Sequence, residues 1–357
     1  MTDTAPYLDT SAALVKTSHE QRVTLSLTDG TETWTSPLLS GDITLDEAWS
    51  PRVQLGAVIP NAFTPAELAA IDPRQNTLRC TVTAGYVHPD GTVDMHPLLA
   101  GHLRDRRARR PGNTLQLEAA SDEALTQDAG WLSTDTFKTF PGVTEALAWF
   151  ASYATGTTVT IDSSVGPGYR PDLTGSIPTQ AGASVWDLMA DIAHAANVRL
   201  FVDTDGTWKI TAKATAAHPT DVTVLDTASD SEDSLSRNDY YSAAVLRYEW
   251  TDAGGVDRAI IGRYGTLPGK VYTEDFDTAI TQASADAAAQ NAVRGLSTRG
   301  DSYTCTDVAA YWLRPGDTVR VVLADGSTVD HIAKQIVFHL TAGTMTVTTR
   351  QPSNLGD

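Results

Sequence analysis

Four Asp-Gly dipeptides, each followed by a threonine or a serine, restrict the fold of this chain more than any other feature. They stand at Asp29-Gly30, Asp90-Gly91, Asp205-Gly206 and Asp325-Gly326, between runs of alternating apolar and polar residues. A two-residue hairpin turn needs positive φ at both central residues, which Asp-Gly tolerates. The alternation is typical of strands with one buried face. The sequence therefore predicts antiparallel hairpins as its main local structure.

Alternating runs fill residues 20–120, where we expect about seven short strands and one short helix, as in a sandwich or small barrel. The helix begins at Thr64-Pro65, Glu67 can complete a capping box, and Pro73 limits its length. Residues 216–357 contain further alternating runs and an alanine-rich helix over 284–296. A second β domain with one helix is expected there.

Residues 184–210, between these two β-rich segments, predict a helix packed on a hairpin. Ser184 can cap the helix, Asn197 can end it in the left-handed conformation, and Val198–Val202 continues as a strand. Another helix followed by a strand is expected over 141–161. We therefore interpret 141–213 as one α/β module, with a glycine- and proline-rich loop over 166–182.

Charge excludes some classes of partner. The 357-residue chain has a formal net charge of −18, whereas a sequence-specific nucleic-acid binder needs a basic footprint. Docking on anionic lipid is disfavoured for the same reason. The N-terminus lacks the apolar core of a signal peptide, and no apolar run approaches a membrane span, so we expect a protein made in a cytoplasm without membrane insertion. Cys80 and Cys305 are expected to be buried free thiols rather than one bridge.

Motifs for catalysis are absent from the sequence. It has no His-Glu-x-x-His, no phosphate loop, no dinucleotide fingerprint and no Gly-x-Ser-x-Gly. We therefore expect a protein that is not an enzyme, with no cofactor and no catalytic or metal-binding residues. His88, His96 and His102 could meet across strands around a metal, but ordinary surface or edge histidines are the favoured interpretation.

A basic run stands out in this acidic chain. It is either a solvated strand end and loop or a contact for an acidic face of a neighbouring subunit. Nucleic-acid binding is a third interpretation, disfavoured because no aromatic residues interleave the run. The run consists of Arg104, Arg106, Arg107, Arg109 and Arg110.

An acidic, serine-rich segment covers residues 221–239, and after a short strand at 222–225 we expect a boundary or loop. Its carboxylates could hold a calcium ion, but they lack the regular spacing of a calcium loop, so a solvated loop is favoured. These carboxylates belong to Asp226, Asp230, Glu232, Asp233 and Asp239.

The order of these elements resembles the hub proteins of bacteriophage tails, and in particular the minor tail proteins of long-tailed actinobacteriophages. The similar residues are Val185–Met189, Phe201–Ile210 and Leu313–Val321. In the last of these, a leucine, any residue, and then Pro-Gly-Asp precede a valine-rich strand, as in that family.

The resemblance implies a mainly β (α+β) fold in which two tube-type β-barrel or sandwich domains flank a small α/β helix–hairpin insert. We expect an N-terminal arm over 1–20, the first β domain over 21–138, the insert over 139–214, and the second β domain, with one helix, over 215–357.

The implied function is structural. Hubs of this kind are homotrimers whose tube-type domains form a pseudo-sixfold ring, which joins the hexameric tail tube to the threefold tail tip around the DNA channel. The implied partners are further copies of this chain, the distal tail protein ring, the tape measure protein and other tail-tip proteins, and the implied location is the tail tip of a virion. The alternative is a carbohydrate-binding or adhesion β module that contacts the host surface, which would need an exposed aromatic platform.

Overall fold

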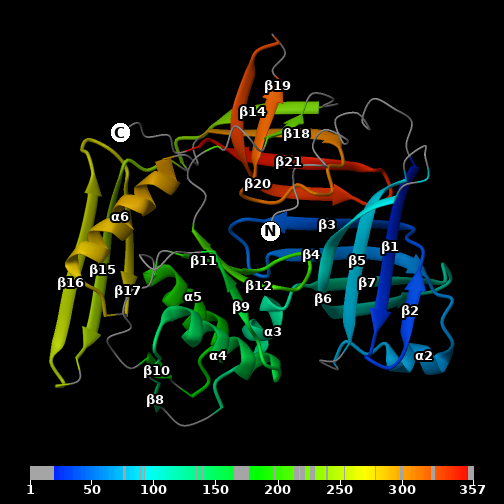
Figure 1. The fold of residues 1–357 in the computed structure, drawn as a ribbon, viewed down its shortest axis with the longest axis horizontal. Coiled ribbons are helices and arrows are strands. Elements are labelled where there is room, and N and C mark those ends of the chain that lie inside the picture. The colour runs from blue at the N-terminus through cyan, green and yellow to red at the C-terminus, as the bar shows by residue number, and fades with distance from the viewer. Residues whose placement is uncertain are drawn as a thin grey trace.

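The computed structural model describes residues 20–352 except 75–77, 88–90, 92, 133–135, 139, 165–176, 180, 197, 213–216, 218–221, 226–229, 239, 253, 278, 298–300 and 323–325. The expected arm over 1–20 therefore lies almost entirely outside the described residues. Strands dominate, and they form one large sheet and three small ones (Figure 1). The prediction of a mainly β fold is confirmed.

The described part of residues 20–120 forms seven strands and one short helix, as the alternation predicts. The elements are β1 (Glu20–Thr28), β2 (Thr33–Ser36), β3 (Ser40–Asp46), β4 (Val53–Pro60), α2 (Pro65–Ala70), β5 (Arg79–Val87), β6 (Val93–Arg109) and β7 (Thr114–Ala120). The Glu67 backbone N–H donates to the Thr64 hydroxyl, and the Thr64 N–H donates to the Glu67 carboxylate. The predicted capping box is therefore confirmed.

Strands from the second half of the chain extend the same sheet to thirteen strands. They are β13 (Val222–Leu225), β14 (Asp230–Leu235), β18 (Asp301–Val308), β19 (Thr318–Val322), β20 (Thr328–His339) and β21 (Thr344–Arg350). The halves join where β20 pairs antiparallel with β3, so that Phe338 lies opposite Ile43. Figure 1 shows this junction as red strands beside blue strands in the centre of the molecule. One apolar core runs beneath both halves.

The β6–β7 and β20–β21 hairpins have the same backbone structure, 230 residues apart. Each has a four-residue turn, over 110–113 and 340–343. The pairing of the two strands within each hairpin is interrupted by a β-bulge at equivalent places, 103/105 and 333/335. The last turn residue is left-handed in both hairpins, with φ 46° at Asn113 and 68° at Gly343. The large sheet therefore contains an internal structural repeat.

The repeat extends to two more strands. β4 pairs with β7 as β18 pairs with β21, and adding 248 to the residue numbers of β4 gives those of β18 from end to end. β3 pairs with β4 as β14 pairs with β18, and adding 190 to residues 40–45 gives 230–235. The sheet thus contains two equivalent four-stranded units, β3-β4-β7-β6 and β14-β18-β21-β20, joined by the β20–β3 pair.

The segment between the two halves has a core of its own. Its elements are α3 (Glu123–Asp128), β8 (Thr136–Lys138), α4 (Val143–Thr155), β9 (Ile161–Ser163), β10 (Ile177–Thr179), α5 (Val185–Ala195), β11 (Val198–Val202) and β12 (Trp208–Ala212). The Asp187 N–H donates to the Ser184 hydroxyl at 3.3 Å, which confirms the predicted cap of α5. That helix packs on the β11–β12 hairpin as expected, while Asn197 lies outside the described residues.

A separate lobe interrupts the second half of the chain. Its three-stranded sheet has the order β16 (Asp257–Gly265), β15 (Ala243–Thr251), β17 (Val271–Phe276), and the alanine-rich helix α6 (Gln282–Ser297) covers one face (Figure 1). The predicted helix over 284–296 is confirmed. The lobe has a third core, built around Leu246 and Tyr248.

Two local expectations are wrong. At the described Asp-Gly sites the glycine has positive φ, but Asp29 and Asp205 do not, so these are not two-residue turns. The Asp205 carboxylate instead accepts the N–H of Thr207 at 2.8 Å, and a longer loop spans from Asp203 to Thr207. Aspartate prefers this side-chain bond over left-handed backbone, and the loop lengthens accordingly.

The segments expected to be loops also contain strands. Within the expected loop 166–182, residues 177–179 form β10, which pairs with β8. Within 226–239, residues 230–235 form β14, which pairs with β18. Neither strand alternates in polarity, and Ser231 to Leu235 of β14 are all exposed, so the pattern that identifies strands is absent.

The expectation about the two cysteines is confirmed. Cys80 and Cys305 are buried free thiols. Among the described residues, none of the helices is both long and apolar enough to cross a membrane.

Candidate subunit-contact surface

The arginine run occupies the end of strand β6 and the start of the turn that follows. Residues 104–109 belong to β6, and only Arg110 lies in the turn that follows. The β-bulge makes Arg104 the extra residue opposite β7, so that Arg107 and Arg109 project from one face of the sheet and Arg106 from the other. All of these arginines except the half-buried Arg106 are exposed.

Three of the arginines are held by groups of their own chain. Arg104 lies 2.6 Å from the Asp128 carboxylate, and Arg107 lies 2.5 Å from that of Asp105 and 3.5 Å from that of Glu118. The Arg106 guanidinium donates to the carbonyl oxygen of Leu68 in α2. These side chains are positioned and partly neutralised within one subunit.

Arg109 and Arg110 keep their positive charge available. The Arg109 guanidinium donates to the neutral amide oxygen of Gln116 at 2.9 Å, and the Arg110 side chain is exposed in the turn. An acidic group from outside the chain could therefore approach this end of β6 without displacing an internal carboxylate.

The acidic segment forms a surface of opposite charge to the arginine run. β14 is the terminal strand of the large sheet, and each residue from Ser231 to Leu235 is exposed. Asp226 and Asp239, which were considered as calcium ligands, lie outside the described residues. Among the residues that the structure does describe, no group of acidic, histidine or cysteine side chains is arranged to hold a metal ion.

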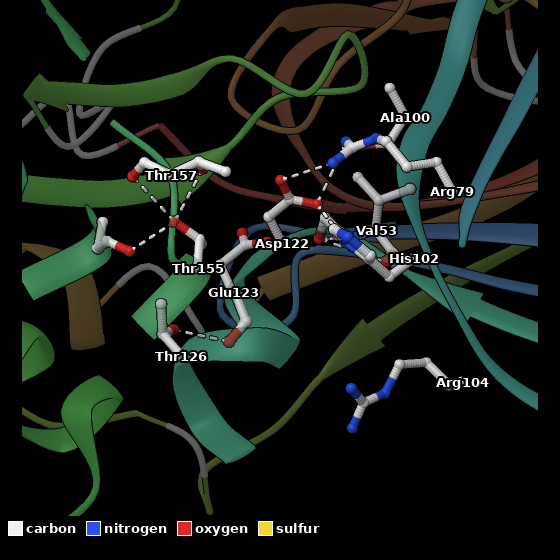
Figure 2. Close-up of polar contacts among 12 residues, drawn as sticks. Val53, Arg79, Ala100, His102, Arg104, Asp122, Glu123, Thr126, Thr155 and Thr157 are labelled. Carbon is white, nitrogen blue, oxygen red and sulfur yellow. Dashed lines mark hydrogen bonds and ion pairs between the residues drawn. The ribbon is translucent and has the colours of Figure 1, made fainter. Parts of the chain in front are cut away.

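The three histidines considered for a metal site are not brought together where the structure describes them. Figure 2 shows Asp122 between His102 and Arg79, with Arg104 lying apart. His102 Nδ1 is 2.9 Å from an Asp122 carboxylate oxygen, and Arg79 is 3.4 Å from the other. His96 instead lies 3.2 Å from Asp94, and His88 is outside the described residues.

A buried ionic junction, which the sequence did not reveal, connects three distant segments. Arg52, at the start of β4, is 4% exposed, and it donates to the carbonyl oxygen of Pro315 at 3.1 Å. Its guanidinium carbon lies 3.9 Å from the ring centroid of Phe201, and that of Arg199 lies 5.0 Å from the same centroid. The Leu313–Asp317 motif, which carries part of the family resemblance, thus supplies a carbonyl oxygen that binds Arg52 to the second half of the chain.

Glu123 completes this junction. Its Oε1 accepts the backbone N–H of Val202 at 2.8 Å and the backbone N–H of Arg52 at 3.4 Å. Burial raises the pKa of Glu123, and burial together with the positive charge of Arg199 lowers the pKa of Arg52 to about 9. Because one Glu123 oxygen accepts from the backbone of both β11 and the residue before β4, the junction fastens the insert to the large sheet.

Glu47 extends the junction toward the last strand. It lies 2.7 Å from Arg350 of β21 and 3.6 Å from Arg199. Burial alone would raise the pKa of Glu47, but the bond from Arg350 and the charge of Arg199 outweigh it, so this pKa lies below its usual value. The only sequence signal for this network was a set of charged residues within strand-like runs.

The tryptophans form no exposed platform. Trp131 and Trp208 are buried, and Trp34, Trp149, Trp186, Trp250 and Trp312 pack partly buried against the three cores. Trp49, in the loop between β3 and β4, is 51% exposed. The tryptophans therefore do not form the aromatic surface that a carbohydrate-binding module needs.

Comparison with solved structures identifies the fold. The tail protein of Neisseria meningitidis MC58 has a TM-score of 0.66 at 15% identity, over 93% of this chain and 96% of that one. The 43 kDa tail protein of prophage MuSo2 from Shewanella oneidensis has a TM-score of 0.64 at 14% identity, over 93% of this chain and all of that one. No family model and no curated protein matches the sequence.

A third similar structure comes from a secretion system. The E. coli c3393 protein, a type VI secretion system component described as structurally similar to the T4 tail proteins gp27 and gp5, has a TM-score of 0.52 at 9% identity, over 94% of this chain and 77% of that one. The chain therefore has the fold of phage tail proteins. More narrowly, it has a hub-like tail fold, and the resemblance predicted from the sequence is confirmed at this level.

Proposed function

We propose that this chain is a structural hub protein of a phage tail tip, and that three copies form a pseudo-sixfold ring between the hexameric tail tube and the threefold tip, around the DNA channel. The fold shared with solved tail proteins supports a structural tail role. The expected neighbours are the distal tail protein ring, the tape measure protein and other tail-tip proteins.

The observation that carries this proposal is the internal repeat. A ring of three chains looks sixfold only if each chain supplies two equivalent units side by side. The units β3-β4-β7-β6 and β14-β18-β21-β20 are equivalent in strand bounds, register and bulge position, and the β20–β3 pair joins them edge to edge. One chain thus has the organisation that a third of such a ring requires.

The face of these strands opposite the core suits a DNA channel. On β18 and β21 this face carries a group of threonines, whose hydroxyls bond across the strands: Thr304 with Thr348 at 3.3 Å and Thr306 with Thr346 at 3.1 Å. Neutral hydroxyls paired with one another offer little attraction to phosphates, and the net charge of −18 repels them at longer range. This threonine group would contribute little attraction for DNA, although Arg107 and Arg109 lie on the same face of the sheet.

Light scattering on the purified protein tests the proposal. A mass of ~114 kDa, three times the 38.1 kDa of one chain, is expected. A monomer at every concentration would contradict the ring. We further propose that the chain is not an enzyme: the three solved structures are described as tail or secretion-system components. Clearing of peptidoglycan in a zymogram would contradict this.

A further inference from the structure

The internal repeat leaves one edge of β6 without the partner that its counterpart has. On β20, residues 335–339 pair with β3. The equivalent residues of β6, 105–109, have β7 on one side, but the pairing with β5 on the other side ends at His102. In the described part of the chain, this edge, which carries the arginine run, is open.

A second open edge belongs to β14. Its counterpart β3 is held between β4 and β20, whereas among the described strands β14 pairs with β18 alone. Leu235, at the end of β14, is 79% exposed. Unpaired strand edges present rows of backbone donors and acceptors that are ready to pair with another chain. In the repeat, β6 is the counterpart of β20 and β14 is the counterpart of β3. The open edges of β6 and β14 therefore correspond to the two edges that pair in the β20–β3 contact.

We propose that β14 of one copy pairs antiparallel with residues 105–109 of β6 in the next copy, which repeats between chains the β20–β3 contact within a chain. This inference rests on the proposed ring. Within the chain, Ile336 pairs with Leu45, Phe338 with Ile43 and His339 with Asp42. The offsets of 230 and 190 residues convert these pairs into Arg106 with Leu235, Ala108 with Asp233 and Arg109 with Glu232.

Charge supports this register independently of the repeat. On one face, Arg109 stands opposite Glu232, and Arg107 is the diagonal neighbour of the same carboxylate. On the other face, Asp233 lies between Arg106 and Arg110. No ion pair in the described part of the chain involves Glu232 or Asp233. Opposite charges at facing and diagonal positions stabilise an antiparallel pair of strands.

The same charges disfavour the alternative pairings. Two β6 edges would bring arginines together, and two β14 edges would bring carboxylates together, so neither edge can readily pair with its own kind. Only the contact between β6 of one copy and β14 of another is favourable. A head-to-tail contact of this kind produces a ring when the last copy also contacts the first. In a threefold ring the contact then occurs six times, three times as β20–β3 within chains and three times as β6–β14 between them.

Charge exchange gives a direct test. We expect Arg109→Glu and Glu232→Arg each to weaken association about tenfold, and the two together to restore it to within about threefold. Arg263→Glu, at an exposed position of β16 in the lobe, is the matched control and should leave the mass unchanged. The measurement is light scattering over a wide range of concentrations at low and high salt.

Cross-linking tests the register itself. The full-length chain with both Ala108→Cys and Asp233→Cys should give covalent dimers and trimers with a short bifunctional maleimide, because the natural cysteines are buried. Pairing Ala108→Cys with Ser231→Cys, two residues out of register, should give markedly less product.

The outcomes separate this contact from the ring. If the wild-type protein is a trimer but the exchanged charges leave its mass unchanged, or the in-register pair does not cross-link, the contact is wrong and the ring stands. If the wild-type protein is a monomer at every concentration, both the ring and the contact are wrong. Restoration by the double exchange together with in-register cross-linking establishes the contact.

Discussion

Removal of the Glu123 side chain is the sharpest test of the buried ionic junction. This carboxylate is 1% exposed, and it binds the N–H groups of both Val202 and Arg52. Glu123→Ala leaves those two donors without an acceptor and leaves the buried Arg52 guanidinium without this nearby negative charge. Breaking a buried charged network in this way costs about 3–5 kcal/mol. Truncation of an exposed glutamate costs far less.

Thermal unfolding measured by tryptophan fluorescence reports this loss, since Trp131 and Trp208 are buried in the insert that Glu123 fastens. A loss of about 3–5 kcal/mol should lower the Tm on the order of 10 °C. Glu118→Ala, at a half-exposed position of β7, is the control and should shift the Tm by no more than about 1 °C. A Tm for Glu123→Ala close to that of this control would refute the reasoning.

The pH dependence has a definite sign. Because burial raises the pKa of Glu123 above its value in the unfolded chain, the native state takes up this proton more readily. The contribution of Glu123 to stability therefore increases as the pH falls through the native pKa, and it is lost as the pH rises through it. Glu123→Gln, which does not titrate, should lose stability relative to the wild type as the pH is lowered.

Three further predictions concern other parts of the fold. Burial raises the pKa of the Cys80 thiol to about 12, so a thiol reagent should label it only after unfolding, and rapid labelling of the folded protein would contradict its burial. Thr64→Ala removes the cap of α2, which should cost about 1 kcal/mol in urea unfolding and speed amide exchange in that helix. Gly101→Ala would place a Cβ 2.1 Å from the carbonyl oxygen of Ala120 and should cost at least about 3 kcal/mol, whereas Gly56→Ala, with nothing within 4 Å, should unfold like the wild type.

Features specified by neighbouring residues could be predicted from the sequence. The Thr64 capping box, the Ser184 cap and the alternation of β3 and β4 each depend on a few adjacent residues, and each is present in the structure. The order of helix, hairpin and β segments followed from these local signals. That order was sufficient to suggest the family resemblance that the fold comparison confirms.

Features that depend on distant partners could not be predicted. β14 is exposed along its length and shows no alternation, so its strand conformation depends on β18, some seventy residues further along the chain. The equivalence of the two hairpins is also hidden, because Arg106 and Ala108 occupy the places of Ile336 and Phe338. The two hairpins have equivalent backbones, but their side chains differ because the strand edges have different neighbours.

The composition of the sequence draws attention to the arginine run, but it does not indicate which groups contact each arginine. The arginine run stands out in the sequence, but only the structure shows that neighbouring carboxylates engage Arg104 and Arg107 and that Arg109 lies at an open edge. The buried junction around Arg52 gave no comparable signal, because an arginine beside a strand most often faces solvent.

The β20–β3 pair also determines when this protein can finish folding. The Gln335 side chain donates to the Asp46 carboxylate at 2.8 Å, across 289 residues of chain. At a synthesis rate of about 5–20 residues per second, β3 leaves the ribosome roughly 15–60 s before its partner exists. Until then its edge is exposed in a nascent chain, and Asp42 and Asp46 place carboxylates along it. Those charges disfavour premature pairing with the same strand of another nascent copy, which is equally acidic. His339 and Gln335, which bind these two aspartates in the folded protein, are translated only after the nearly 300 residues that separate the two strands.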